Sequence, residues 1–140
     1  MYTNLVGIRI NMQFSTKAEY GLKAMINLAQ CFPEQKTIKE IAKEENISQK
    51  YLERLLGVLN KDNLVTSHKW KSVGYILAKN PKKINVGEII EILEGTIAPM
   101  RCVGKFCSAK NKCPSSIVLN KLGVQIRKTL YNIKLSELIK

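Results

Sequence analysis

Hydrophobic residues recur at the spacing of one helix face in the segment after the first fourteen residues. Thr16 stands three residues before Glu19, which is the spacing of a capping box at a helix start. Pro33 breaks the pattern shortly after Cys31. We therefore expect a helix from Ser15 to about Cys31. Its apolar face is formed by Ala18, Leu22, Met25, Ile26 and Ala29.

Two shorter helices, joined by a turn of about four residues, are predicted next. The first begins at Thr37, which forms a capping box with Glu40. The second begins after Ser48, a residue type favoured at helix N-caps. The apolar face of the second helix is formed by Leu52, Leu55, Leu56 and Leu59. This arrangement is that of a helix-turn-helix, whose second helix enters the major groove of DNA.

A β-hairpin is predicted directly after the helix-turn-helix. Residues 64–66 and 74–77 are the strand-forming runs, and the tip between them is basic and contains Trp70. A hairpin in this place is the wing of a winged helix-turn-helix. A further helix is expected from Asn85 to Glu94, ending at Gly95.

The rest of the chain divides into a loop and a long helix. Residues 96–113 contain helix breakers and three of the four cysteines, and they predict a loop. From Pro114 an apolar stripe at three–four spacing continues to Ile133. Because a lone amphipathic helix at the end of a small domain has no core left to cover, we expect it to pair with a second copy. The predicted fold is mainly α with a small β-hairpin wing, a winged helix-turn-helix plus a long C-terminal dimerisation helix.

The length of 140 residues fits one domain with an attached helical arm. We divide it into a leading arm at residues 1–11, which is a candidate for disorder, and two functional parts. Residues 12–83 form the DNA-binding domain, and residues 84–140 hold the cysteine loop and the dimerisation helix.

Charge is distributed in blocks. The formal net charge is +12, from 23 Lys and Arg against 11 Asp and Glu. Residues 61–83 hold six lysines and Asp62, a net charge of +5, and residues 101–140 hold nine basic side chains and Glu137, a net charge of +8. Basic stripes of this kind are typical of polyanion binding, although a solvated lysine-rich surface gives the same count.

The sequence argues against several other classes of protein. No apolar run reaches the roughly 20 residues that span a bilayer, and no export signal is evident, so we expect a cytoplasmic protein without a membrane partner. A glycine-rich phosphate loop and the G-x-S-x-G motif are both missing, and His68 is the single histidine. We therefore expect no enzyme activity and no small-molecule substrate.

The first turn of the helix after Ser48 carries side chains that read base edges. Gln49 pairs bidentately with adenine, and Lys50 reaches guanine or phosphate. Tyr51 offers a hydroxyl and a ring for a thymine methyl, while Glu53 accepts a hydrogen bond from cytosine N4. Two further DNA contacts are expected from the wing tip, at Lys69 and Lys71.

Residues 12–25, 47–56 and 74–79 resemble the Rrf-type winged-helix transcriptional regulators. The resemblance implies a dimeric bacterial transcription factor, often a repressor, that binds an operator in double-stranded DNA. Two positions depart from the family pattern. Residues 69–75 lack most of the usual wing glycines, with Lys69 in place of an arginine, and Ser116 occupies a position where some members have histidine.

The same resemblance implies an iron–sulfur cluster held by three cysteines in the loop before the dimerisation helix. Cys102, Cys107 and Cys113 stand there in this sequence. Some members of the family supply a carboxylate ligand from the first helix, in certain cases across the dimer, which makes Glu19 a candidate for the fourth ligand. Cys31 is the other candidate. We favour [4Fe–4S] over [2Fe–2S] and expect the cluster to report redox state, nitric oxide, iron or iron–sulfur status.

Three other readings of the cysteines stay open. The chain could be a cluster-free regulator of the same family, of the cysteine-metabolism type or with a thiol switch. The thiols could bind zinc together with a carboxylate. Less expected is a small redox protein that uses the same scaffold.

Overall fold

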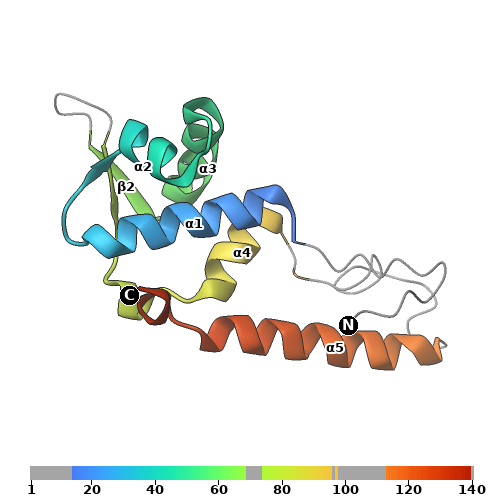
Figure 1. Cartoon of the computed structure of the whole chain (residues 1–140). Helices are drawn as coiled ribbons and strands as arrows, with labels where there is room; N and C mark the ends of the chain where they lie inside the picture. Colours follow the sequence, from blue (N-terminus) through green and yellow to red (C-terminus); the bar gives the residue numbers. More distant parts are fainter. Residues whose placement is uncertain (1–13, 69–73, 96, 98–112, 140) are drawn as a thin grey trace, which may run out of the picture.

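The computed structural model describes residues 14–68, 74–95, 97 and 113–139. Figure 1 shows a compact body of short elements and one long helix that extends from it. In chain order the elements are α1 (Thr16–Cys31), β1 (Lys36–Thr37), α2 (Ile38–Glu45), α3 (Gln49–Lys61), β2 (Val65–His68), β3 (Gly74–Leu77), the 3-10 turn η1 (Pro81–Lys83), α4 (Val86–Glu94), α5 (Pro114–Asn132) and the 3-10 turn η2 (Leu135–Leu138). The predicted mainly helical, winged fold is confirmed. No described helix combines the length and the hydropathy that a membrane span requires.

The core of the body forms where α1 meets α2, α3 and α4. Met25 of α1, Leu52 and Leu56 of α3, and Ile89 of α4 are completely buried. The predicted hairpin is present, with Thr66 opposite Ile76 in an antiparallel pair. A third strand, β1, pairs with the other edge of β3, so the strand order is β1–β3–β2.

A buried asparagine ties α1 to the helix-turn-helix. Asn27 is only 2% exposed, and its amide nitrogen donates to the carboxylates of Glu44 and Glu45, at 2.8 Å each. Its carbonyl oxygen accepts from Lys36 Nζ at 2.8 Å. Because each polar atom of the buried amide has a partner, the contact fixes α2 on α1 without leaving an unsatisfied group.

Of the three side-chain caps predicted at helix starts, two are present. Thr37 and Glu40 form the expected capping box, and the Ser48 hydroxyl accepts a hydrogen bond from the N–H of Tyr51 at 3.3 Å. The capping box expected at Thr16 is wrong, because the N-cap position of α1 is Ser15, and no side chain there accepts a hydrogen bond from the first turn. The Ser15 N–H donates to the carboxylate of Glu94 at 2.7 Å, and its hydroxyl donates to the same group.

Among the described residues, the long helix α5 packs on α4 through its C-terminal half. Tyr131 lies against Gly87 of α4, and after α5 the chain turns back to bury Leu135 completely. The helix therefore does cover part of an intramolecular core, which differs from the prediction of an unpartnered stripe along its whole length. Its N-terminal half leaves four apolar side chains exposed, namely Ile117, Val118, Leu122 and Val124.

Candidate nucleic-acid interface

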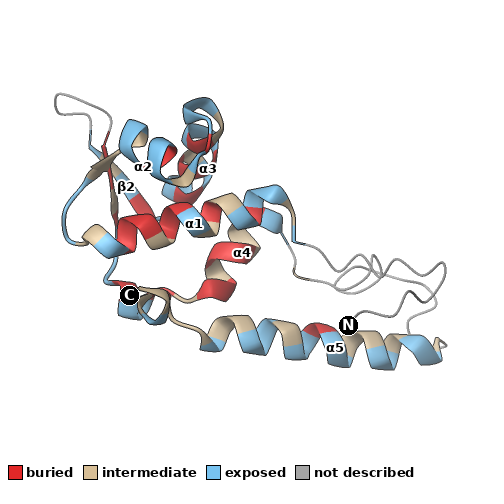
Figure 2. Ribbon diagram, viewed as in Figure 1, coloured by how far each residue is buried: buried red, intermediate tan, exposed pale blue. Residues whose placement is uncertain are grey.

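The helix α3 has one buried face and one exposed face (Figure 2). The exposed face carries charged side chains. Its four leucines are at most 4% exposed and hold the helix on the body. The side chains of Gln49, Lys50 and Arg54 are exposed, and they form no hydrogen bond or ion pair with the described part of the chain. Glu53 is exposed on the same side. Long polar side chains on the open face of the second helix are what direct readout of the major groove requires.

The start of α3 is fixed by two contacts. Ser48 caps it, and the ring of Tyr51 packs edge-on against Tyr20 of α1, with 5.9 Å between ring centroids. The Tyr51 ring is therefore engaged by the body of the protein, so it orients the first turn of α3.

Loss of the cap should destabilise the protein measurably. We expect Ser48→Ala to lower the free energy of unfolding by about 1 kcal/mol, because the Tyr51 N–H loses its acceptor. Urea unfolding followed by circular dichroism measures the change. Ser48→Thr retains a hydroxyl and should cost much less. Equal losses in both variants would contradict a capping role.

The structure adds cationic residues that the sequence reasoning missed. Arg54 lies one turn after Lys50 on α3, and Lys39 and Lys43 are exposed one turn apart on α2. The signal for Arg54 was available, since a residue four positions after Lys50 must share its helix face. In the hairpin, the last described pair is His68 opposite Gly74. The predicted contacts Lys69 and Lys71 lie outside the described residues.

Of the three predicted cluster cysteines, Cys113 alone lies in the described part of the chain. It occupies the N-cap position of α5, and its sulfur is 2.9 Å from the Ser115 hydroxyl. This hydrogen bond is the largest cause that lowers the pKa of the Cys113 thiol, followed by a backbone hydrogen bond from Ser116. Stabilisation of the thiolate suits a metal ligand or a reactive thiol.

The two candidates for a fourth ligand differ in their surroundings. The Glu19 carboxylate is exposed and pairs with Lys23 at 3.1 Å, a surface contact that is readily exchanged. The Cys31 thiol donates to the carbonyls of Leu28 and Glu34, and burial raises its pKa. The environment of Glu19 therefore suits a ligand better than that of Cys31.

The described residues do not by themselves assemble a metal site. No three His, Cys, Asp or Glu side chains gather within residues 14–68, 74–95, 97 and 113–139. In Figure 1 the first turn of α5, which follows Cys113, lies well beyond the end of α1 that carries Glu19. Within one chain these two donors are on separated elements.

The hydrogen bond to Cys113 makes a testable difference to its reactivity. In a background with Cys31, Cys102 and Cys107 replaced by serine, we expect Ser115→Ala to move the pH midpoint of Cys113 alkylation upward. The lowered pKa means that the thiolate forms at lower pH in the parent, and this advantage is lost with the hydroxyl. Mass spectrometry after timed iodoacetamide treatment measures the midpoint. Ser115→Thr should leave it in place, and an unchanged midpoint in Ser115→Ala would contradict the prediction.

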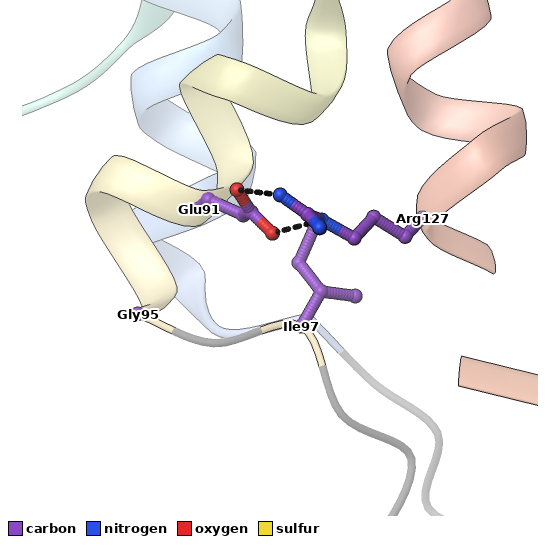
Figure 3. Close-up of a pocket in the computed structure, with 4 residues that line it drawn as sticks. All are labelled: Glu91, Gly95, Ile97 and Arg127. Atoms are coloured by element: carbon purple, nitrogen blue, oxygen red, sulfur yellow. Dashed lines mark hydrogen bonds and ion pairs between the residues drawn. The ribbon is translucent and has the colours of Figure 1, made fainter. Parts of the chain in front are cut away.

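An open cavity of about 430 Å³ lies between the C-terminal end of α4 and α5, and Figure 3 shows its lining. Arg127 Nε donates to Glu91 at 2.7 Å, and Ile97 and Gly95 complete the walls. The charged groups of the cavity satisfy each other, so the contact fixes α5 on α4.

The capped helix pair, the free cationic face of α3 and the hairpin beside it define a winged-helix DNA-binding protein. Comparison with known sequences then places the chain in a family: residues 14–140 match the Rrf2 family, described as an iron-dependent transcriptional regulator. The chain belongs to the Rrf2 family of transcriptional regulators, which bind DNA.

Two named regulators are among the similar sequences. It is 43% identical over 90 residues to the HTH-type transcriptional regulator CymR of Bacillus subtilis (strain 168), a match that covers 64% of this chain and 65% of that protein. It is 32% identical over 130 residues to the regulator IscR of Sodalis glossinidius, covering 91% of this chain and 79% of that protein.

Solved structures agree with the sequence comparison. The fold is similar to CymR, "the Global Cysteine Regulator of B. subtilis", with a TM-score of 0.74, 32% identity, and coverage of 91% of this chain and 95% of that chain. It is also similar to T. potens IscR, with a TM-score of 0.75, 37% identity, and coverage of 91% and 86%.

Proposed function

We propose that this chain acts in the cytoplasm as a homodimeric, sequence-specific regulator of transcription that represses promoters by binding operators. Residues 12–83 read DNA, with α3 in the major groove. The contacts to DNA come from the first turns of α3, at Ser48, Gln49, Lys50, Tyr51 and Glu53. Two more contacts come from the segment between β2 and β3, at Lys69 and Lys71. The observation that carries the proposal is the exposed, unpaired cationic face of α3 directly opposite its buried leucines.

The dimer interface is the N-terminal half of α5. Val118 and Val124 are 66% and 63% exposed, which is unusual for apolar residues on a helix of a monomer. A second copy offers the same stripe and would cover it symmetrically. Two copies present two α3 helices, so the operator should consist of two inverted half-sites.

The regulatory site is an iron–sulfur cluster bound by Cys102, Cys107 and Cys113, with Glu19 as the fourth ligand. Support comes from the stabilised Cys113 thiolate, the accessible Glu19 carboxylate and the iron-dependent description of the family. Because Cys113 and Glu19 are on separated elements of one chain, the carboxylate would come from the second protomer. A bound cluster supplies a centre that responds to oxidants and to iron supply, and we favour [4Fe–4S].

Purification without oxygen, followed by visible absorption and assays of iron and sulfide, tests the cluster. We expect a coloured protein with iron and sulfide in similar amounts, and loss of both in Cys113→Ser. The matched control is Cys31→Ser, which should keep the cluster. A colourless, iron-free parent protein would contradict this part of the proposal.

A cluster-free thiol switch is the second candidate. It is favoured by the similarity to the global cysteine regulator CymR, whose relative from Staphylococcus aureus has a solved structure of an "oxidized form". The lowered pKa of Cys113 is consistent with such a switch. It predicts that peroxide changes DNA affinity in iron-free protein, and that Cys113→Ser removes the response.

A further inference from the structure

A glycine occupies the middle of the exposed face of α3. Gly57 lies seven positions after Lys50, a rotation of about 700°, so the two positions lie within about 20° of each other on the helix. Leu59, only two residues on, is rotated by about 200° and is completely buried. Gly57 therefore lies opposite the leucine face. At this position no side chain separates the helix backbone from a binding partner on the exposed face.

Nothing within the described protein explains this glycine. A Cβ atom at Gly57 would meet no atom within 4 Å, whereas one at Gly21 would meet Leu93 at 2.1 Å and one at Gly87 would meet Tyr131 at 2.2 Å. The φ angle of Gly57 is not positive, in contrast to that of Gly95. Glycine in a helix interior destabilises the helix relative to alanine. A glycine that is neither packed nor strained indicates a close approach by a partner.

The surroundings of Gly57 indicate the chemistry of that partner. Val58 beside it is 40% exposed, an apolar surface on an otherwise charged face. Lys50, Arg54 and Lys61 are exposed on the same face. The carboxylate of Glu53, one turn before Gly57, lies on this face as well. The missing side chain of Gly57 and the exposed Val58 thus form a small apolar notch among charged groups of net positive charge, which complements an apolar group carried by a polyanion. In the major groove that group is the C5-methyl of thymine, which small apolar side chains contact.

We propose that the notch formed by Gly57 and Val58 receives the C5-methyl group of a thymine, which makes both residues specificity determinants of the DNA-reading helix. This inference rests on the proposed function, because it requires α3 to lie in the major groove. The ring of Tyr51, the other apolar group near the helix start, is engaged by Tyr20.

The test uses the full chain and a duplex selected by it from a randomised library. Each thymine is replaced singly by deoxyuridine, which lacks only the C5-methyl group, and affinity is measured by fluorescence anisotropy at fixed salt. At one position of the half-site, the change from thymine to deoxyuridine should weaken binding of the parent protein about fourfold, as expected for one buried methyl group. For the Val58→Ala variant, the same change from thymine to deoxyuridine should weaken binding less than twofold. The matched control Thr129→Ala shortens a β-branched, exposed side chain of similar size on the C-terminal half of α5, and it should keep the fourfold effect.

A second variant fills the notch. Gly57→Gln should bind the selected duplex at least tenfold more weakly than the parent protein does. On random duplex, the affinities of the variant and the parent should be equal. If the parent selects no sequence over random duplex, the proposed function itself is wrong. If it selects a sequence but every deoxyuridine is tolerated, or Val58→Ala keeps the full methyl effect, only the notch inference is overturned.

Discussion

Replacement of Lys50 and Arg54 together by alanine should weaken binding to the selected operator by about 100-fold, because each side chain supplies a base or phosphate contact worth roughly 1–3 kcal/mol. Both are exposed on α3 and have no partner among the described residues, so the free protein loses no ion pair. The free energy of unfolding should change by less than about 0.5 kcal/mol. Anisotropy titrations at several salt concentrations measure both the affinity and its salt dependence.

The matched control is the replacement of Lys82 and Lys83 by alanine. These lysines are exposed on η1, which Figure 1 places below α1, on the other side of that helix from α3. The change in net charge is the same in both variants, so only a local contact distinguishes them. We expect the control to keep affinity within about threefold of the parent. Similar losses in both variants would mean that the general field of the +12 chain, and not α3, determines binding.

The elements predicted correctly from the sequence are those specified by neighbouring residues. The capping box of Thr37 and Glu40 and the Ser48 cap each join residues three positions apart, through hydrogen bonds between a side chain and the backbone, and the structure confirms them. The leucine face of α3 is likewise a local pattern, and it determined which side of that helix is exposed. The predicted turn, hairpin and long helix followed from the same kind of signal.

Contacts between distant residues could not be predicted in this way. Glu94 lies 79 positions after Ser15 and accepts a hydrogen bond from its N–H, whereas local spacing predicted a capping box between Thr16 and Glu19. The strand β1 is only two residues long and is recognisable only by its pairing with β3. Nothing in the local sequence indicates that Gly87 faces an aromatic ring from α5.

The candidate DNA interface was predictable in part. The side chains at the start of α3 followed from its cap, and the spacing of Arg54 from Lys50 would have placed it on the same face. Gly57 becomes evident only when the whole face is viewed opposite its buried side. The cluster was suggested by the family resemblance, and the structure contributes the surroundings of Cys113 and Glu19. Cys102 and Cys107 lie outside the described residues, so their part in the site stays a prediction.

Gly87→Ala should detach the C-terminal half of α5 from the body. The added Cβ would lie 2.2 Å from Tyr131 Cδ2, and the ring has little freedom to move. Its hydroxyl donates to Glu91, and Arg127 lies over the ring at 5.0 Å from its centroid while also pairing with Glu91. We expect a loss of about 2 kcal/mol in the free energy of unfolding, even though alanine is ordinarily the better helix former.

A double variant separates steric conflict from other effects of the substitution. Tyr131→Ala alone removes a packed ring and is destabilising. In a protein that already carries Tyr131→Ala, the Cβ added by Gly87→Ala no longer overlaps with the ring. The two losses should therefore be far from additive, with a coupling of about 1–2 kcal/mol measured by urea unfolding. Gly57→Ala, where a Cβ meets nothing within 4 Å, is the matched control and should stabilise the chain. Additive losses would show that Gly87 does not serve the contact with Tyr131. In the proposed dimer that contact also fixes the angle between the two α3 helices, so Gly87→Ala should weaken operator binding although it touches no DNA.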